Sequence, residues 1–274
     1  MVITGLDSTS NDGSRLNSEV LELSNKGLFC QNMAPYAKKT EAATGALVNG
    51  KLLICGGKDS HVYYDECYKI TKSSTSFVTK MKTKKAYLSS VVVDHFILWL
   101  VGGKSCDTCS ALSSTEYVRI SQGSTLGPYL PYSTYGHTIT AVSCNDHGVM
   151  DEICDQTTGF CLCKPTYGSP YPTYILIGGY GGENKTFYYS QNNKNWTTGP
   201  QLNEKRFQHA TGLGIDSATS KQYIAITGGL NNNETLDSVE ILHSGETNWE
   251  IGMHFLFIID RAAVCTNNDL FLVV

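Results

Sequence analysis

One short phrase, an apolar run followed by two glycines, recurs along this chain of 274 residues. Its clear copies are Leu53-Ile54-Cys55-Gly56-Gly57, Leu98-Trp99-Leu100-Val101-Gly102-Gly103, Leu176-Ile177-Gly178-Gly179 and Ala225-Ile226-Thr227-Gly228-Gly229. Degenerate copies open and close the chain at residues 2–5 and 270–274. Successive copies are about 50 residues apart, except for the 76 residues between Gly103 and Gly179. A fixed period of this length indicates a repeat architecture in which each period forms one structural unit.

The apolar runs predict buried strands, because they contain Val, Ile, Leu and Trp without the spacing of a helix face. A glycine can take a positive φ, or let a neighbouring backbone approach where a Cβ would collide. We therefore expect the glycines of the four pairs to be structural: Gly56, Gly57, Gly102, Gly103, Gly178, Gly179, Gly228 and Gly229.

Each period reads as four short antiparallel strands. The apolar run is the second strand, and a tight turn joins it to the first, at Asn49-Gly50 in one period and at Asp94-His95 in the next. Asn-Gly between two apolar runs is a strong hairpin signal. Plentiful glycine and tyrosine fit an all-β chain. A four-stranded unit cannot bury both faces alone, so we expect the units to stack radially as the blades of a β-propeller.

The order of these features resembles the kelch family. A tryptophan follows the glycine pair and the third strand, as Trp196 and Trp249, and a basic residue precedes the first strand, as Arg206 and Arg261. The resemblance covers nearly the whole chain and implies an all-β, kelch-type β-propeller. Four complete and two partial periods are present, so we expect a six-bladed parent whose two ends are truncated here.

The 76-residue interval between Gly103 and Gly179 contains a cysteine-rich segment. Its core is Cys154-Asp155-Gln156-Thr157-Thr158-Gly159-Phe160-Cys161-Leu162-Cys163, with Cys144 upstream. This core resembles the laminin-type EGF module, with one extra residue before the glycine. The resemblance implies that Cys144 pairs with Cys161, which leaves Cys154 and Cys163 to pair together or to rearrange.

The cysteine-rich segment defines the expected domain organisation. The propeller occupies residues 1–142 and 173–274, and the small disulfide-rich insertion occupies residues 143–172. A zinc site is an alternative for this segment, since Cys144, His147, Cys161 and Cys163 offer four ligands, but the spacing lacks the two Cys-x-x-Cys motifs of zinc knuckles.

Two further cysteine pairs are disulfide candidates. Cys106 and Cys109 form a Cys-x-x-Cys motif in a loop, without the βαβ surroundings of a redox centre, so a small loop disulfide is expected. Cys55 and Cys67 fall on neighbouring antiparallel strands and are candidates for a cross-strand bridge, if the register brings them together.

Cysteine content and glycosylation motifs indicate the compartment. The chain has ten cysteines, and its Asn-x-Thr triplets begin at Asn184, Asn195 and Asn233. Together they favour an oxidising setting, either extracellular or the ectodomain of a membrane protein. Met1 leads directly into a strand rather than into a signal peptide, and no apolar run reaches the length of a membrane span.

Charge and motifs bound the possible chemistry. The net charge of −4 argues against nucleic acid as a partner. No nucleophile elbow, metalloprotease motif or phosphate loop is present, and we expect no cofactor. Basic residues of the segments that lead into the first strands suggest a docking face for an acidic protein or a glycan, with these candidates: Lys82, Lys84, Lys85, Lys205 and Arg206.

The combination predicts a function in binding. A kelch propeller with an EGF-type module resembles the extracellular attractin and multiple-EGF-like-domain proteins, which implies a non-catalytic protein-interaction module. One alternative is a kelch enzyme similar to galactose oxidase, in which His137, His209, Arg206 and Arg261 gather around the central channel as a copper site. In the interaction reading these four residues form hydrogen bonds to neighbouring blades. A second alternative is an intracellular kelch adaptor.

Overall fold

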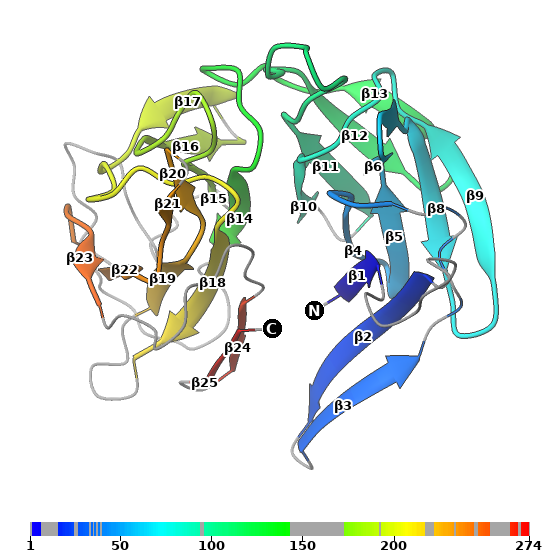
Figure 1. The fold of residues 1–274 in the computed structure, drawn as a ribbon, viewed down its shortest axis with the longest axis horizontal. Helices are drawn as coiled ribbons and strands as arrows, with labels where there is room; N and C mark the ends of the chain where they lie inside the picture. The colour runs from blue at the N-terminus through cyan, green and yellow to red at the C-terminus, as the bar shows by residue number, and fades with distance from the viewer. Residues whose placement is uncertain are drawn as a thin grey trace. The chain divides into compact units, whose positions relative to one another are not determined.

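The computed structural model describes most of the chain as short strands (Figure 1). The described residues are 2–6, 16–24, 27–32, 34–252, 264–267 and 270–273, and the gaps within 34–252 are 35, 37, 39, 94–95, 143–172, 192, 217–221, 233 and 244–245. All the regular secondary structure in this part of the chain is β-strand, which confirms the all-β prediction. The chain divides into two compact units, unit 1 (residues 1–135) and unit 2 (residues 136–274).

Unit 1 contains two four-stranded antiparallel sheets, named here blade 1 and blade 2. Blade 1 consists of β4 (Thr44–Val48), β5 (Lys51–Cys55), β8 (Glu66–Ile70) and β9 (Thr75–Lys80). Blade 2 consists of β10 (Ser89–Val93), β11 (Ile97–Val101), β12 (Thr115–Arg119) and β13 (Gly123–Leu126). A three-stranded sheet and a short hairpin complete the unit: β1 (Val2–Leu6), β2 (Leu16–Ser24), β3 (Gly27–Asn32), and β6 (Lys58–Asp59) with β7 (Val62–Tyr63).

Unit 2 contains blades 3 and 4, built in the same way. Blade 3 consists of β14 (Thr138–Val142), β15 (Thr173–Ile177), β16 (Thr186–Ser190) and β17 (Asn195–Thr198). Blade 4 consists of β18 (Ala210–Ile215), β19 (Gln222–Thr227), β22 (Val239–His243) and β23 (Glu250–Ile251). Two short hairpins accompany them: β20 (Leu230–Asn231) with β21 (Glu234–Thr235), and β24 (Val264–Asn267) with β25 (Leu270–Val273).

A buried hydrophobic cluster lies between the two blades of each unit, as expected if a single blade cannot bury both of its faces. In unit 1 the buried cluster is Val48, Leu53, Cys55, Cys67, Met81, Leu88, Leu98, Leu100 and Val118. In unit 2 it is Val142, Ile175, Ile177, Tyr188, Leu202, Ile224, Ile226, Leu242 and Trp249. Both clusters draw on the apolar run that the repeat analysis assigned to the second strand of each blade.

The glycine pairs sit where the second strand of each blade ends. All eight glycines have positive φ, between 58° and 102°. At Gly178 an added Cβ would lie 2.6 Å from the carbonyl oxygen of Arg206, so this position excludes a side chain on two grounds. The second glycine of a pair also links its blade to the next segment, because Gly57 N–H donates to the carbonyl of Lys85 (2.8 Å) and Gly179 N–H to that of Arg206 (2.9 Å).

A hairpin turn joins the first two strands of blade 1. In blade 1 the turn Asn49-Gly50 has φ values of 49° and 68°, and Val48 pairs directly with Lys51. Positive φ at both central residues is the type I′ geometry that suits the twist of a hairpin. In blade 3 the corresponding partners are Val142 and Thr173, so residues 143–172 replace a turn.

Candidate functional site

The segment that leads into each first strand has the same conformation in all four blades. The residue two places before the strand has a positive φ, namely Ala42 (55°), Tyr87 (56°), Gly136 (64°) and Gln208 (57°). The residue four places before the strand is buried in every case, and these residues are Thr40, Lys85, Thr134 and Arg206. Two of the expected partner-binding cations therefore occupy a position that faces the protein interior.

Lys85 and Arg206 are each held by a buried glutamate of the same blade. Lys85 Nζ lies 3.1 Å from Oε1 of Glu116, and Nη2 of Arg206 lies 2.9 Å from Oε1 of Glu240. All four side chains are fully buried. Burial lowers the pKa of Lys85, and the nearby charge of Glu116 opposes that shift. The prediction that Lys85 and Arg206 contact a partner is wrong, because neither charge reaches the surface.

The other predicted cations remain at the surface. Lys82 and Lys84 are exposed, whereas Lys205 forms an ion pair with Glu183 at 2.6 Å. Among the described residues Lys82 and Lys84 make no ion pair. The docking face expected on the lead-in segments is thus reduced to two unpaired lysines.

Two disulfides are present in unit 1. Cys55 of β5 and Cys67 of β8 lie directly opposite each other and form a fully buried cross-strand disulfide. Cys106 and Cys109 form a disulfide within an exposed loop. The predicted cysteines Cys144, Cys154, Cys161 and Cys163 lie outside the described residues.

The loop of the second disulfide carries a polar cluster centred on Asp107. The Asp107 carboxylate forms a hydrogen bond with His61 Nδ1, accepts a hydrogen bond from the Tyr63 hydroxyl (2.9 Å) and lies 3.2 Å from Lys58 Nζ. The hydrogen bonds from His61, then Tyr63 and Lys58, lower the pKa of Asp107 to about 2. The cluster connects the loop to the β6–β7 hairpin, and the sequence pattern did not predict it because Asp107 is 44 to 49 residues away from its three partners.

The histidines considered for copper are buried in unit 2. His209 Nε2 lies 3.1 Å from the hydroxyl oxygen of Thr138, which bonds in turn to Thr211. Burial lowers the pKa of His209 to about 3, and the charges of Arg206 and His137 add to the effect. Among the described residues no group of three or more His, Cys, Asp or Glu side chains stands close enough to hold a metal ion.

The predicted glycosylation sites differ in accessibility. Asn195 is exposed at the start of β17, the last strand of blade 3. Asn184 is half-buried, and its amide nitrogen donates to Gln201. Asn233 lies outside the described residues.

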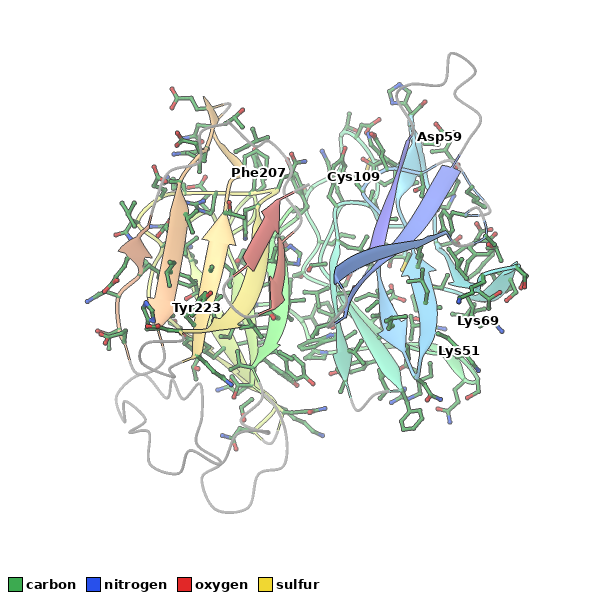
Figure 2. All side chains as sticks on the ribbon, turned by 90° about the horizontal axis from the view of Figure 1, so that it is seen from below. Lys51, Asp59, Lys69, Cys109, Phe207 and Tyr223 are labelled. Atoms are coloured by element: carbon green, nitrogen blue, oxygen red, sulfur yellow. A yellow bond between two sulfur atoms is a disulfide. The ribbon has the colours of Figure 1, made fainter. Side chains whose placement is uncertain are left out.

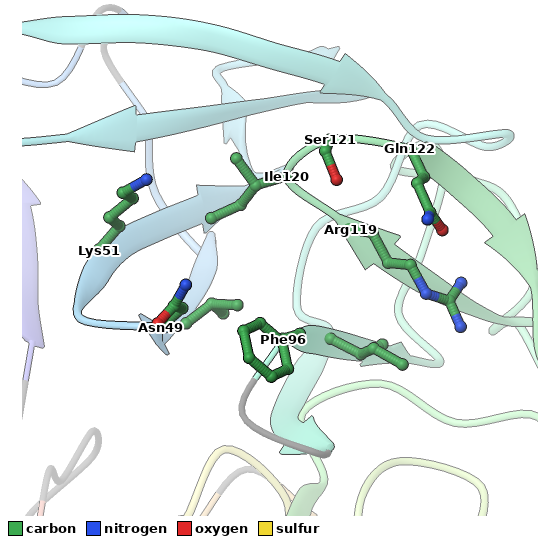
Figure 3. Close-up of a pocket in the computed structure, with 9 residues that line it drawn as sticks. Asn49, Lys51, Phe96, Arg119, Ile120, Ser121 and Gln122 are labelled. Carbon is green, nitrogen blue, oxygen red and sulfur yellow. The ribbon is translucent and has the colours of Figure 1, made fainter.

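A groove of about 510 Å³ lies at the turn end of blades 1 and 2 (Figure 3). Its walls come from the β4–β5 turn, from the start of β11 and from the β12–β13 turn. The lining residues are Val48, Asn49, Lys51, Phe96, Ile97, Arg119, Ile120, Ser121 and Gln122. Figure 3 shows the Phe96 ring between Asn49 and Arg119. Sequence reasoning did not find this groove, because it forms from segments of two different repeats.

Comparison with known proteins supports both parts of the expected architecture. The chain is similar to the solved structure of YjhT, with a TM-score of 0.67, 13% sequence identity, and coverage of 99% of this chain and 88% of that one. The fold is a β-propeller. The family model for the laminin EGF domain matches residues 143–170. The match begins directly after Val142, the last residue of β14 in blade 3. No curated protein matches the chain.

The described part of this β-propeller contains no helix that is long and apolar enough to span a membrane.

Proposed function

We propose that the protein is an extracellular, non-catalytic interaction module built on a kelch-type β-propeller. One observation carries the proposal. A laminin EGF domain, matched over residues 143–170, is inserted between two directly paired strands of a propeller blade. EGF-like modules are disulfide-dense scaffolds of secreted proteins, and they typically mediate protein contacts.

Features of the propeller itself support the extracellular assignment. Two disulfides occur in unit 1, and such bonds persist in oxidising compartments. Asn195 offers an exposed acceptor for a glycan. Glycine pairs, a buried arginine before β18 and the buried Trp249 before β23 support the kelch assignment. The proposed relatives are attractin-like ectodomains, and the proposed partner is a protein.

Expression as a secreted protein, followed by a binding screen, tests this function. The chain is expressed behind a signal peptide in eukaryotic cells, and the secreted product is screened against an array of extracellular proteins. We expect secretion, cysteines that resist alkylation unless reduced, and a saturable protein partner. Free thiols at most of the ten cysteines would overturn the extracellular assignment, and turnover by the purified protein would overturn the non-catalytic one.

A further inference from the structure

We infer that the groove at the turn end of blades 1 and 2 binds an acidic peptide segment that carries a bulky apolar side chain. The inference rests on the proposed function in protein interaction and names the site and the partner chemistry. It also moves the docking site away from the lead-in segments, where burial of Lys85 removes a cation from the surface.

Part of the lining of the groove is apolar. Phe96 is 60% exposed at the start of the hairpin arm that leads into β11, and it lies beside the half-buried Ile97 and Ile120. A phenylalanine is usually buried, and one placed in a hollow with two isoleucines offers apolar area for a ligand side chain.

The lining of the groove also carries positive charge. Lys51 and Arg119 line the groove, and neither forms an ion pair with any described residue. Lys69 and Lys72 on the same end of blade 1 add positive charge, and Figure 2 shows Lys51 and Lys69 at one end of unit 1 with Asp59 and Cys109 at the other. Asp94, two residues before Phe96 in the sequence, lies outside the described residues.

The polar groups of the groove suit an extended main chain. The Asn49 and Gln122 amides and the Ser121 hydroxyl can each donate and accept hydrogen bonds, as peptide groups require. Arg119 can bind a carboxylate in a bidentate manner. A sulfated glycan would satisfy the cations but would leave Phe96 and its isoleucine neighbours without an apolar partner. The combination therefore favours a peptide with Asp or Glu close to Leu, Ile, Phe or Trp.

Peptide selection on the full chain tests the inference. Phage-displayed random dodecapeptides are selected on the immobilised protein, and enriched peptides are synthesised for affinity measurement by fluorescence anisotropy. We expect enriched sequences to combine an acidic and a bulky apolar residue. Their affinity should fall about tenfold or more in each of Phe96→Ala and Arg119→Glu.

Matched controls lie elsewhere in unit 1. Phe77→Ala removes another aromatic ring that is 55% exposed, and Lys84→Glu reverses an exposed charge on a lead-in segment. Both should bind the peptides as the wild type does. Circular dichroism confirms that each variant is folded, and Lys51→Glu replaces Arg119→Glu if the latter is not.

Each remaining outcome counts against the inference. Selection that yields no peptides, or peptides without acidic residues, overturns it, and so does unchanged affinity in the groove variants. Binding of heparin alone would show a polyanion site instead. If a protein partner binds the groove variants normally, the groove inference fails while the proposed function stands, whereas absence of any protein partner removes the function itself.

Discussion

Lys85 and Glu116 form a buried ion pair in blade 2 that Arg206 and Glu240 reproduce at the same positions of blade 4. In both blades the glutamate also accepts two backbone N–H groups of the lead-in segment. For Glu116 these come from Lys82 (2.7 Å) and Thr83 (3.2 Å). The pair therefore fixes the segment that starts the blade as well as its own two charges.

Loss of one partner of this pair should be strongly destabilising. Lys85→Met leaves the Glu116 charge buried and unpaired, and we expect a loss of about 3–5 kcal/mol of unfolding free energy. Blade 3 has Thr134 and Phe187 at the two positions, so Lys85→Thr combined with Glu116→Phe should cost less than either single change. Denaturant titration measures the losses, with exposed Lys84→Met as the control. A single variant as stable as that control would contradict the prediction.

Substitution of Gly178 and of Gly50 should lower stability by different amounts. Gly178→Ala should destabilise by more than about 1 kcal/mol, because the new Cβ meets the Arg206 carbonyl in addition to the positive φ of 58°. Gly50→Ala has a comparable φ of 68° but no atom within 4 Å of the added Cβ, so it should cost only the conformational term. Thermal unfolding of the two variants measures the difference. Equal losses would show that crowding at Gly178 is unimportant.

The insertion should be dispensable for folding. Val142 and Thr173 are direct partners, as Val48 and Lys51 are around a two-residue turn in blade 1. Replacement of residues 143–172 by Asn-Gly should leave far-UV circular dichroism of the same β type, because loop closure depends only weakly on length. An unfolded or insoluble shortened protein, next to a folded parent, would mean that the segment belongs to the core.

Stability should fall in acid partly through His209. Its pKa of about 3 in the folded state lies below the ordinary value of 6.5, so the unfolded state binds the extra proton between these pH values. This contribution is complete above pH 6.5 and is lost as pH falls toward 3, by about 1.4 kcal/mol per pH unit at most. His209→Gln should flatten the pH dependence of the unfolding free energy in this window. An unchanged slope would contradict the buried, neutral state.

Periodicity predicted the blades, because Gly-Gly pairs and the Asn49-Gly50 turn are local signals with few structural solutions. The burial of Lys85 and Arg206 was not predicted, since the sequence does not show whether a basic residue before a strand points outward or inward. A signal does exist within the four described blades: a glutamate at the position of Glu116 and Glu240 occurs only in blades 2 and 4, whose lead-in segments have the buried basic residue. The groove at Phe96 depends on the spacing of two blades, which no single repeat specifies.

The direct pairing of Val142 with Thr173 has a consequence for proteolysis. A protease that cuts the chain once between residues 143 and 172 would leave β14 and β15 joined by five residue pairs and by the hydrophobic core of unit 2. Such a nicked protein would run as two fragments on a denaturing gel, unless a disulfide spans the cut, and yet elute as one species from a sizing column. Cleavage there would release the insertion at one end while the propeller remains a single particle.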